Sequence, residues 1–231
     1  LIESPFHEEH PSVARVSQLA HVINAYLDRL KDLSAKPYVK YVSIFRNHGL
    51  DAGASLSHPH SQIISTPIIP KVVEEELKAS KNFWTENKKC VFCDIIRKEA
   101  DGPRFIWENK TFFVFAPWAS VHPFEFWIFP KGHQSTLLNI GQEETEALAG
   151  TLRVCFGGLK ALLSDPSYNF GFHITPTEGF LSHYHWHLEV YPRLAIWAGF
   201  EKSTGMFINV MSPEDAAASM KERFQAEEKQ C

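Results

Sequence analysis

Two cysteines and two histidines in the second half of the chain have the residue types of a metal site. Cys90 and Cys93 are separated by two residues, and His133 and His185 follow further along the chain. Thiolates at this spacing can occupy one edge of a tetrahedral site, which two imidazoles would complete as a Cys₂His₂ set. Four protein ligands leave no open position, so we expect a structural zinc ion. Spacing alone does not identify the histidines, and the alternative is two small buried residues beside unrelated imidazoles.

A second group of reactive residues lies in the segment His58-Pro59-His60-Ser61-Gln62. In a strand, residues two apart face the same way, so His58, His60 and Gln62 would form one polar stripe. A neutral imidazole is a good nucleophile toward phosphorus, and the Gln62 amide could donate to a phosphoryl oxygen as charge develops. The alternative is a structural or metal-binding histidine pair.

The loop before this segment could approach a phosphate. It contains Asn47, Gly49, Gly53 and Ser55, which offer backbone N–H groups, an amide and a hydroxyl. Glycine lets the backbone come close to a ligand. Taken alone, the loop is more typical of an ordinary surface turn.

The elements that would position these residues occur twice. A long helix, a strand, a loop and a His-x-His strand occur over residues 12–64 and again over 143–191. The second copy is preceded by the cysteine pair and three strand candidates. We therefore predict two repeats, 1–80 and 81–231, the first without its opening half.

The second repeat departs from the first at one chemically important position. Glu189 stands where Gln62 stands in the first repeat, and a carboxylate would repel an anionic phosphoryl group. We therefore predict that the second repeat is non-catalytic and that its histidines are metal ligands or structural groups. Glu189 and Glu76 could also be ligands, although a solvated carboxylate is the favoured interpretation for Glu76.

The remaining pattern predicts a soluble α+β protein. We expect helices at 12–33, near 74–79, at 143–163 and a short one from 213, with strands at 38–45, 58–64, 104–107, 111–115, 124–129, 168–174 and 183–191. The net charge of −4 favours no nucleic-acid partner, and no apolar run is long enough for a membrane span. We see no signal peptide, and the scattered Cys155 and Cys231 favour a reducing cytoplasm over a disulfide framework.

The loop and the histidine segment together read Asn47-x-Gly-x-x-x-Gly53-x-Ser55-x-x-His58-Pro59-His60-x-Gln62. This pattern resembles the active-site signature of galactose-1-phosphate uridylyltransferases, a branch of the histidine-triad proteins. Plant ADP-glucose phosphorylases share the pattern. Residues 2–5, 123–125, 130–133 and 199–201 also resemble segments of this family. The resemblance implies a histidine-triad-like fold, with two repeats of antiparallel sheet and flanking helices.

The resemblance also implies roles for individual residues. His60 matches the nucleophile, and Gln62 matches the glutamine that hydrogen-bonds the transferred phosphoryl group. The remaining matches are Asn47, Gly53, Ala54 and Ser55 around the nucleotide phosphates, Phe200 and Glu201 at the hexose, His58 at a first zinc ion, and Cys90, Cys93, His133 and His185 at a second. Because the stretch around Phe200 reaches the other subunit in the family, a homodimer is implied.

The activity implied is a ping-pong transfer of UMP from UDP-glucose to galactose 1-phosphate through a uridylyl-histidine. One alternative is an ADP-glucose phosphorylase, which uses inorganic phosphate as acceptor. Another is a zinc-stabilised nucleotide-binding module without catalysis.

Overall fold

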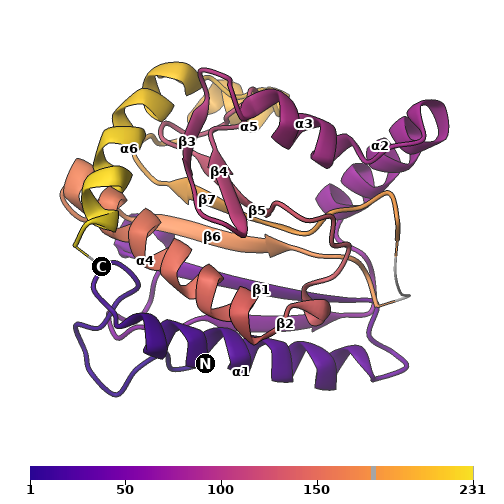
Figure 1. The fold of residues 1–231 in the computed structure, drawn as a ribbon, viewed down its shortest axis with the longest axis horizontal. Coiled ribbons are helices and arrows are strands. Elements are labelled where there is room, and N and C mark those ends of the chain that lie inside the picture. Colours follow the sequence, from indigo (N-terminus) through magenta and orange to yellow (C-terminus); the bar gives the residue numbers. More distant parts are fainter. Residues whose placement is uncertain (178–180, 231) are drawn as a thin grey trace.

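A single seven-stranded antiparallel sheet forms the centre of the molecule, in a computed structural model that describes residues 1–177 and 181–230 (Figure 1). The strand order is β2-β1-β6-β7-β5-β4-β3. The strands are β1 (Tyr41–His48), β2 (Gln62–Thr66), β3 (Phe105–Glu108), β4 (Phe112–Phe115), β5 (Phe126–Pro130), β6 (Tyr168–His173) and β7 (His187–Pro192). The predicted fold class, α+β with an antiparallel sheet and flanking helices, is confirmed.

Helices cover the two faces of the sheet unequally. The helices are α1 (Val16–Ser34), α2 (Lys71–Asn87), α3 (Val91–Glu99), α4 (Gln142–Leu163), α5 (Gly199–Thr204) and α6 (Pro213–Glu228). Helices α1, α4 and α6 pack together over the main hydrophobic core, while α3 packs on a smaller aromatic cluster. Strand β4 separates the two clusters, because Phe112 and Val114 belong to the main core and Phe113 and Phe115 to the smaller one. None of the helices in the described part of the chain is long and apolar enough to cross a membrane.

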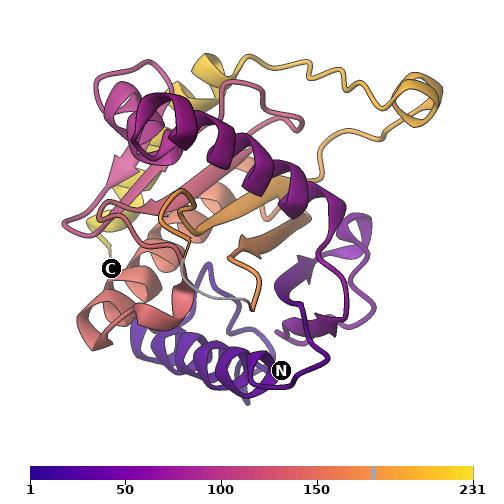
Figure 2. The same cartoon turned by 90° about the vertical axis from the view of Figure 1, so that its right-hand side faces the viewer.

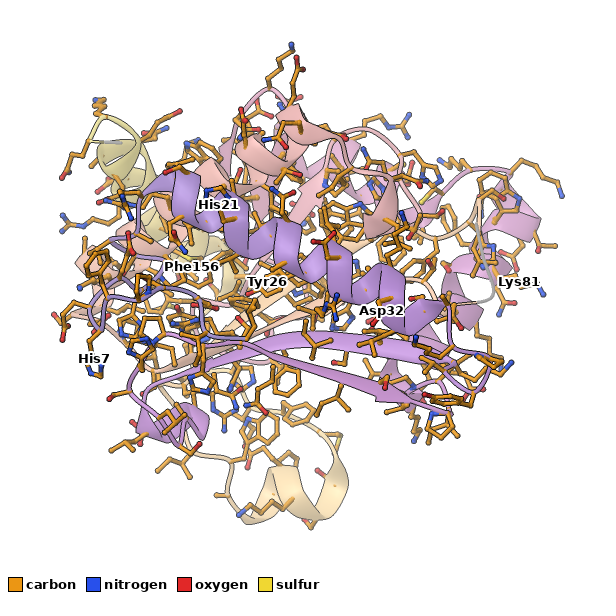
Figure 3. All side chains as sticks on the ribbon, turned by 90° about the horizontal axis from the view of Figure 1, so that it is seen from below. His7, His21, Tyr26, Asp32, Lys81 and Phe156 are labelled. Carbon is orange, nitrogen blue, oxygen red and sulfur yellow. The ribbon has the colours of Figure 1, made fainter. Side chains whose placement is uncertain are left out.

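The two halves of the sheet meet where β1 pairs with β6. Arg46 lies opposite Phe170, and Asn47 lies opposite Asn169. The boundary predicted at residue 80 lies inside α2, and both predicted repeats contribute to the main core. Figure 3 shows α1 lying over the strands, with Tyr26 between the helix and the sheet.

Several elements differ from their predicted bounds. Strand β7 begins at His187 rather than 183, because Tyr184 N–H donates to Leu181 in a turn and Trp186 N–H donates to the Gln134 carbonyl. Cys90 is the residue before the first turn of α3, a helix that the sequence pattern did not predict. The last helix extends over 16 residues and was wrongly expected to be short. Cys231 lies outside the described residues.

Candidate functional site

A cavity of about 450 Å³ opens at the end of β1. Three of the four residues predicted at the phosphates, Asn47, Ala54 and Ser55, line it together with His58. The other lining residues are His10, Arg46, His48, Gly49, Leu50, Leu56, Ser57 and Asp165. The predicted residues His60, Gln62 and Gly53 are not part of this lining. The structure therefore brings most of the predicted loop together around one cavity and adds histidines that the sequence pattern did not single out.

Two glycines shape the loop beside the cavity. Gly49 has φ +80° and ψ 160°, and Gly53 has φ +77°, which are conformations that favour glycine. A Cβ at Gly49 would lie 2.1 Å from the Ser167 Oγ, so the chain approaches the residue before β6 too closely for a side chain. Asn169 donates from Nδ2 to the Asn47 Oδ1 at 2.8 Å. The Nδ2 group of Asn47 is therefore the part of that side chain that can donate to a ligand.

His60 lies in a short extended segment before β2 and is held in one tautomer. Its Nδ1 lies 2.9 Å from the His58 carbonyl oxygen, and its backbone forms a bridge with Ile2. A carbonyl oxygen only accepts, so Nδ1 carries the proton and Nε2 keeps its lone pair. Ser61 is buried on the core side, which leaves His60 and Gln62 on the opposite face of the segment.

His58 meets a second imidazole that the sequence pattern did not single out. Its Nδ1 lies 3.2 Å from the Nδ1 of His7, and its Nε2 lies 2.8 Å from the Ser4 carbonyl. Two imidazole ligands of one tetrahedral zinc ion have nitrogens about 3.3 Å apart. His7 lies just after the segment 2–5 that resembles the family, and this proximity was the sequence signal that could have identified it. These imidazoles could supply two ligands, and further ones would have to come from elsewhere.

The four predicted zinc ligands Cys90, Cys93, His133 and His185 converge, with ligand atoms within 4.8 Å of one another. The Cys93 Sγ lies 3.3 Å from the His133 Nδ1 and 3.5 Å from the His185 Nδ1. Bond lengths to zinc predict a sulfur–nitrogen edge of about 3.6 Å in a tetrahedral site. Hydrogen bonds from Cys93, and then from both histidines, lower the pKa of Cys90. The donor set and its spacing therefore fit a zinc ion held by this chain alone.

A second, largely buried cluster lies on the face of the sheet opposite α1, α4 and α6, and it contains Glu76, His173, His187 and Glu189. His173 Nδ1 lies 2.8 Å from Glu76, which also accepts from Tyr184. The prediction of a solvated Glu76 is therefore wrong, because α2 carries this side chain onto the sheet. Burial alone would lower the pKa of His173, but the carboxylates of Glu189 and Glu76 outweigh it and raise the pKa to about 9.

His187, the counterpart of His60, has no ring nitrogen available for attack. Its Nδ1 lies 3.2 Å from the His185 carbonyl oxygen, and its Nε2 lies 3.1 Å from the Glu189 carboxylate. Each ring nitrogen is therefore engaged by an acceptor oxygen. This arrangement agrees with a second repeat that is structural. The four groups of the cluster could alternatively hold a metal ion, since their ligand atoms also lie within 4.8 Å of one another.

Phe200 and Glu201 lie apart from the cavity. Both are in α5, which stands away from the body of the molecule between two extended connections (Figure 2). Phe200 is 46% exposed, and the Glu201 carboxylate accepts from the Ala198 N–H at the start of the helix. Within this one chain these two predicted hexose contacts are not brought to the cavity at the end of β1.

Comparison with known proteins places the chain among nucleotidyltransferases. A family model described as a domain of unknown function, DUF4921, matches residues 12–231. An ADP-glucose phosphorylase of Arabidopsis thaliana is 35% identical over 226 residues, which cover 96% of this chain and 63% of the relative. A galactose-1-phosphate uridylyltransferase of Thermotoga maritima is 34% identical over 216 residues, which cover 90% of this chain and 68% of the relative.

Solved structures agree with the sequence matches. A uridylyltransferase structure superposes with a TM-score of 0.92 at 30% identity, covering 97% of this chain and 74% of that one. The Arabidopsis thaliana ADP-glucose phosphorylase with bound ADP-glucose gives 0.90 at 33% identity, covering 96% and 71%. The chain thus spans less than the full length of these proteins. On these matches, the chain belongs to the galactose-1-phosphate uridylyltransferase family of nucleotidyltransferases, which includes the ADP-glucose phosphorylases.

Proposed function

We propose that this chain carries the nucleophile of a nucleotidyltransferase that acts on a nucleotide sugar, with His60 as the covalent carrier of the nucleoside monophosphate. The observation that supports this most directly is the hydrogen bond from His60 Nδ1 to the His58 carbonyl. In that tautomer Nε2 holds the lone pair, whereas both nitrogens of the counterpart His187 face acceptors. Our first choice of substrates is UDP-glucose and galactose 1-phosphate.

The reaction would proceed in two displacements at one phosphorus atom. The His60 Nε2 lone pair forms a P–N bond to the α-phosphorus, and the bond to the bridging oxygen breaks, so that glucose 1-phosphate leaves with the electron pair. A phosphate oxygen of galactose 1-phosphate then attacks the same phosphorus, and the P–N bond breaks to return the lone pair to His60. Two easier displacements replace one difficult displacement. Gln62 would donate to the phosphoryl oxygens, and the enzyme's contribution is mainly alignment and charge stabilisation.

The phosphate groups would lie in the cavity at the end of β1. Asn47 and Ser55 offer an amide and a hydroxyl there, and the backbone of Gly53 and Ala54 completes the loop. We further propose that Phe200 and Glu201 contact the hexose in a second copy of the chain, because α5 extends away from its own body. This would make the protein a homodimer.

The metal sites would be structural. Zinc held by Cys90, Cys93, His133 and His185 would tie α3 to the loops after β5 and before β7. His58 would serve a first zinc site together with His7. We place the protein in the cytoplasm, and we describe it as two repeats, 1–80 and 81–231, that share one sheet.

A second candidate function is that of an ADP-glucose phosphorylase, in which inorganic phosphate replaces galactose 1-phosphate. The 35% identity to the Arabidopsis thaliana enzyme favours it. A non-catalytic nucleotide-binding module is the remaining alternative.

Intact-protein mass spectrometry separates these functions. The chain is incubated with UDP-glucose or, separately, with ADP-glucose, and hexose 1-phosphate is assayed in the supernatant. We expect a mass gain of one nucleoside monophosphate with the true donor and its loss on adding the acceptor. His60→Ala should abolish the gain, and His21→Ala, an exposed histidine on α1, should not change it. Binding of both nucleotide sugars without any covalent adduct would favour the non-catalytic module.

A further inference from the structure

A buried ion pair lies directly beneath the segment that carries His60. Arg46 of β1 donates from Nε to both carboxylate oxygens of Glu3, at 3.2 Å and 3.0 Å. Glu3 is 4% exposed and Arg46 is 1% exposed. Charges removed from water lower stability unless they are paired and hydrogen-bonded, and an apolar replacement is often as stable. Stability alone therefore does not account for such a pair beside a reactive group.

Glu3 holds the His60 segment from both sides of the nucleophile. Its backbone N–H donates to the Pro59 carbonyl at 3.0 Å, and its carboxylate accepts from the Ser61 hydroxyl. Tyr26 of α1 hydrogen-bonds both Ser61 and the Glu3 carboxylate. Pro59 and Ser61 flank His60, so the nucleophile lies between two positions that Glu3 contacts.

The other backbone contacts of this segment also come from the first residues of the chain, since the Ser61 amide donates to the Leu1 carbonyl at 2.9 Å. Pro59 has no N–H to donate, and the regular pairing of β2 with β1 begins only at Gln62, opposite Phe45. The backbone of His60 instead forms an isolated bridge with Ile2. The short segment around Glu3 thus takes the place of a neighbouring strand at the edge of the sheet.

Arg46 connects the same unit to the wall of the cavity. Its Nη1 donates to the Tyr168 hydroxyl at 3.0 Å, and its Nη2 lies 2.9 Å from the His10 Nδ1. A guanidinium only donates, so His10 must accept at Nδ1 and carry its proton on Nε2. Burial, followed by the charge of Arg46, lowers the pKa of His10 to about 4. His10 is therefore a neutral group of fixed tautomer in the lining of the cavity.

We propose that the Glu3–Arg46 pair is the positioning unit of the active site. Through Ser61 and the Pro59 carbonyl, Glu3 fixes the position of His60. Through His10, Arg46 fixes that position relative to the cavity at the end of β1. Neither residue is a catalytic residue. The inference rests on the proposed function of His60 as nucleophile, and it assigns to this pair the alignment that the displacement at phosphorus requires. A displacement of about 1 Å in such a site can lower the rate roughly a hundredfold.

The test compares Ser61→Ala and Glu3→Gln with a matched ion pair elsewhere. Arg153 of α4 and Glu227 of α6 form a similar pair at 2.6 Å, with side chains 17% and 12% exposed. Glu227→Gln should lower stability without changing the rate of His60 labelling by the nucleotide sugar. Both Ser61→Ala and Glu3→Gln should lower that rate about ten- to a hundredfold at saturating donor, with little change in donor affinity. Ser61→Ala removes only one hydroxyl, so it provides the test on its own if Glu3→Gln does not fold.

Hydrogen exchange gives a readout that does not depend on activity. The Ser61 amide donates to the Leu1 carbonyl at 2.9 Å, and its exchange should become faster in Ser61→Ala and Glu3→Gln but not in Glu227→Gln. If the wild-type protein is never labelled, the proposed function fails, while the exchange data still test the positioning. If the wild type is labelled and the two variants match it in labelling rate, or if Glu227→Gln is equally slow, the positioning role is overturned.

Discussion

The Cys₂His₂ cluster allows a quantitative test by loss of one ligand. Cys93→Ser is the smallest perturbation, because it exchanges one sulfur for oxygen at a half-buried position between His133 and His185. The two measured sulfur–nitrogen distances, 3.3 Å and 3.5 Å, are close to the edge expected around zinc. We expect wild-type protein to bind zinc at this site without rearrangement, and Cys93→Ser to lose one equivalent of metal.

The magnitude follows from linkage between binding and folding. Zinc that binds the folded chain with a free concentration a thousand times its Kd stabilises it by about 4 kcal/mol. In a domain of this length, 1 kcal/mol corresponds to a shift in Tm of roughly 2–4 °C. Chelation should therefore lower the Tm of the wild type by ~8–16 °C. The Cys93→Ser variant should start near the lower value and respond weakly to the chelator.

The assay is thermal unfolding with and without chelator, combined with metal analysis of the same samples. Cys155→Ala is the matched control, since Cys155 is a fully buried cysteine of the main core and not a ligand. It should be less stable than the wild type and yet keep its metal content and its response to chelator. Equal metal content in the wild type and Cys93→Ser would refute the assignment of these four ligands.

The other predictions concern the loop and a buried histidine. Gly49→Ala should destabilise the protein by about 1–3 kcal/mol through backbone strain alone, with a further loss of stability from the clash with Ser167. Gly53→Ala has nothing within 4 Å of the new Cβ, so it should lose less stability in denaturant unfolding. An equal loss of stability in the two variants would contradict the close packing at Gly49. Burial lowers the pKa of His122 to about 4, so the unfolded chain takes up the proton first as pH falls, and stability should drop by roughly 3 kcal/mol between about pH 6.5 and 4. His122→Phe should flatten that part of the profile, and an unchanged slope would show that His122 is not its source.

The sequence was informative where chemistry is local. The spacing of His58, His60 and Gln62 was enough to place His60 and Gln62 on one face, because side chains alternate along extended chain. The cysteine pair likewise marked its own half of the Cys₂His₂ cluster that the fold brings together. The fold class followed from the alternation of amphipathic helices with short β-rich segments. These features depend on neighbours within a few residues, which a sequence displays directly.

Contacts between distant segments were decided only in three dimensions. The sequence did not show that Glu3 would lie beneath His60, that His7 would meet His58, or that α2 would carry Glu76 onto His173. Each of these contacts depends on how strands pair and where a helix crosses the sheet, and those choices reflect burial summed over the whole core. Residue types and spacing thus determined which groups could react, and the ring-nitrogen partners of His60 and His187 lie only two residues away along the chain. Tertiary packing decided which distant groups surround these imidazoles, because a contact between remote segments exists only once the chain has folded.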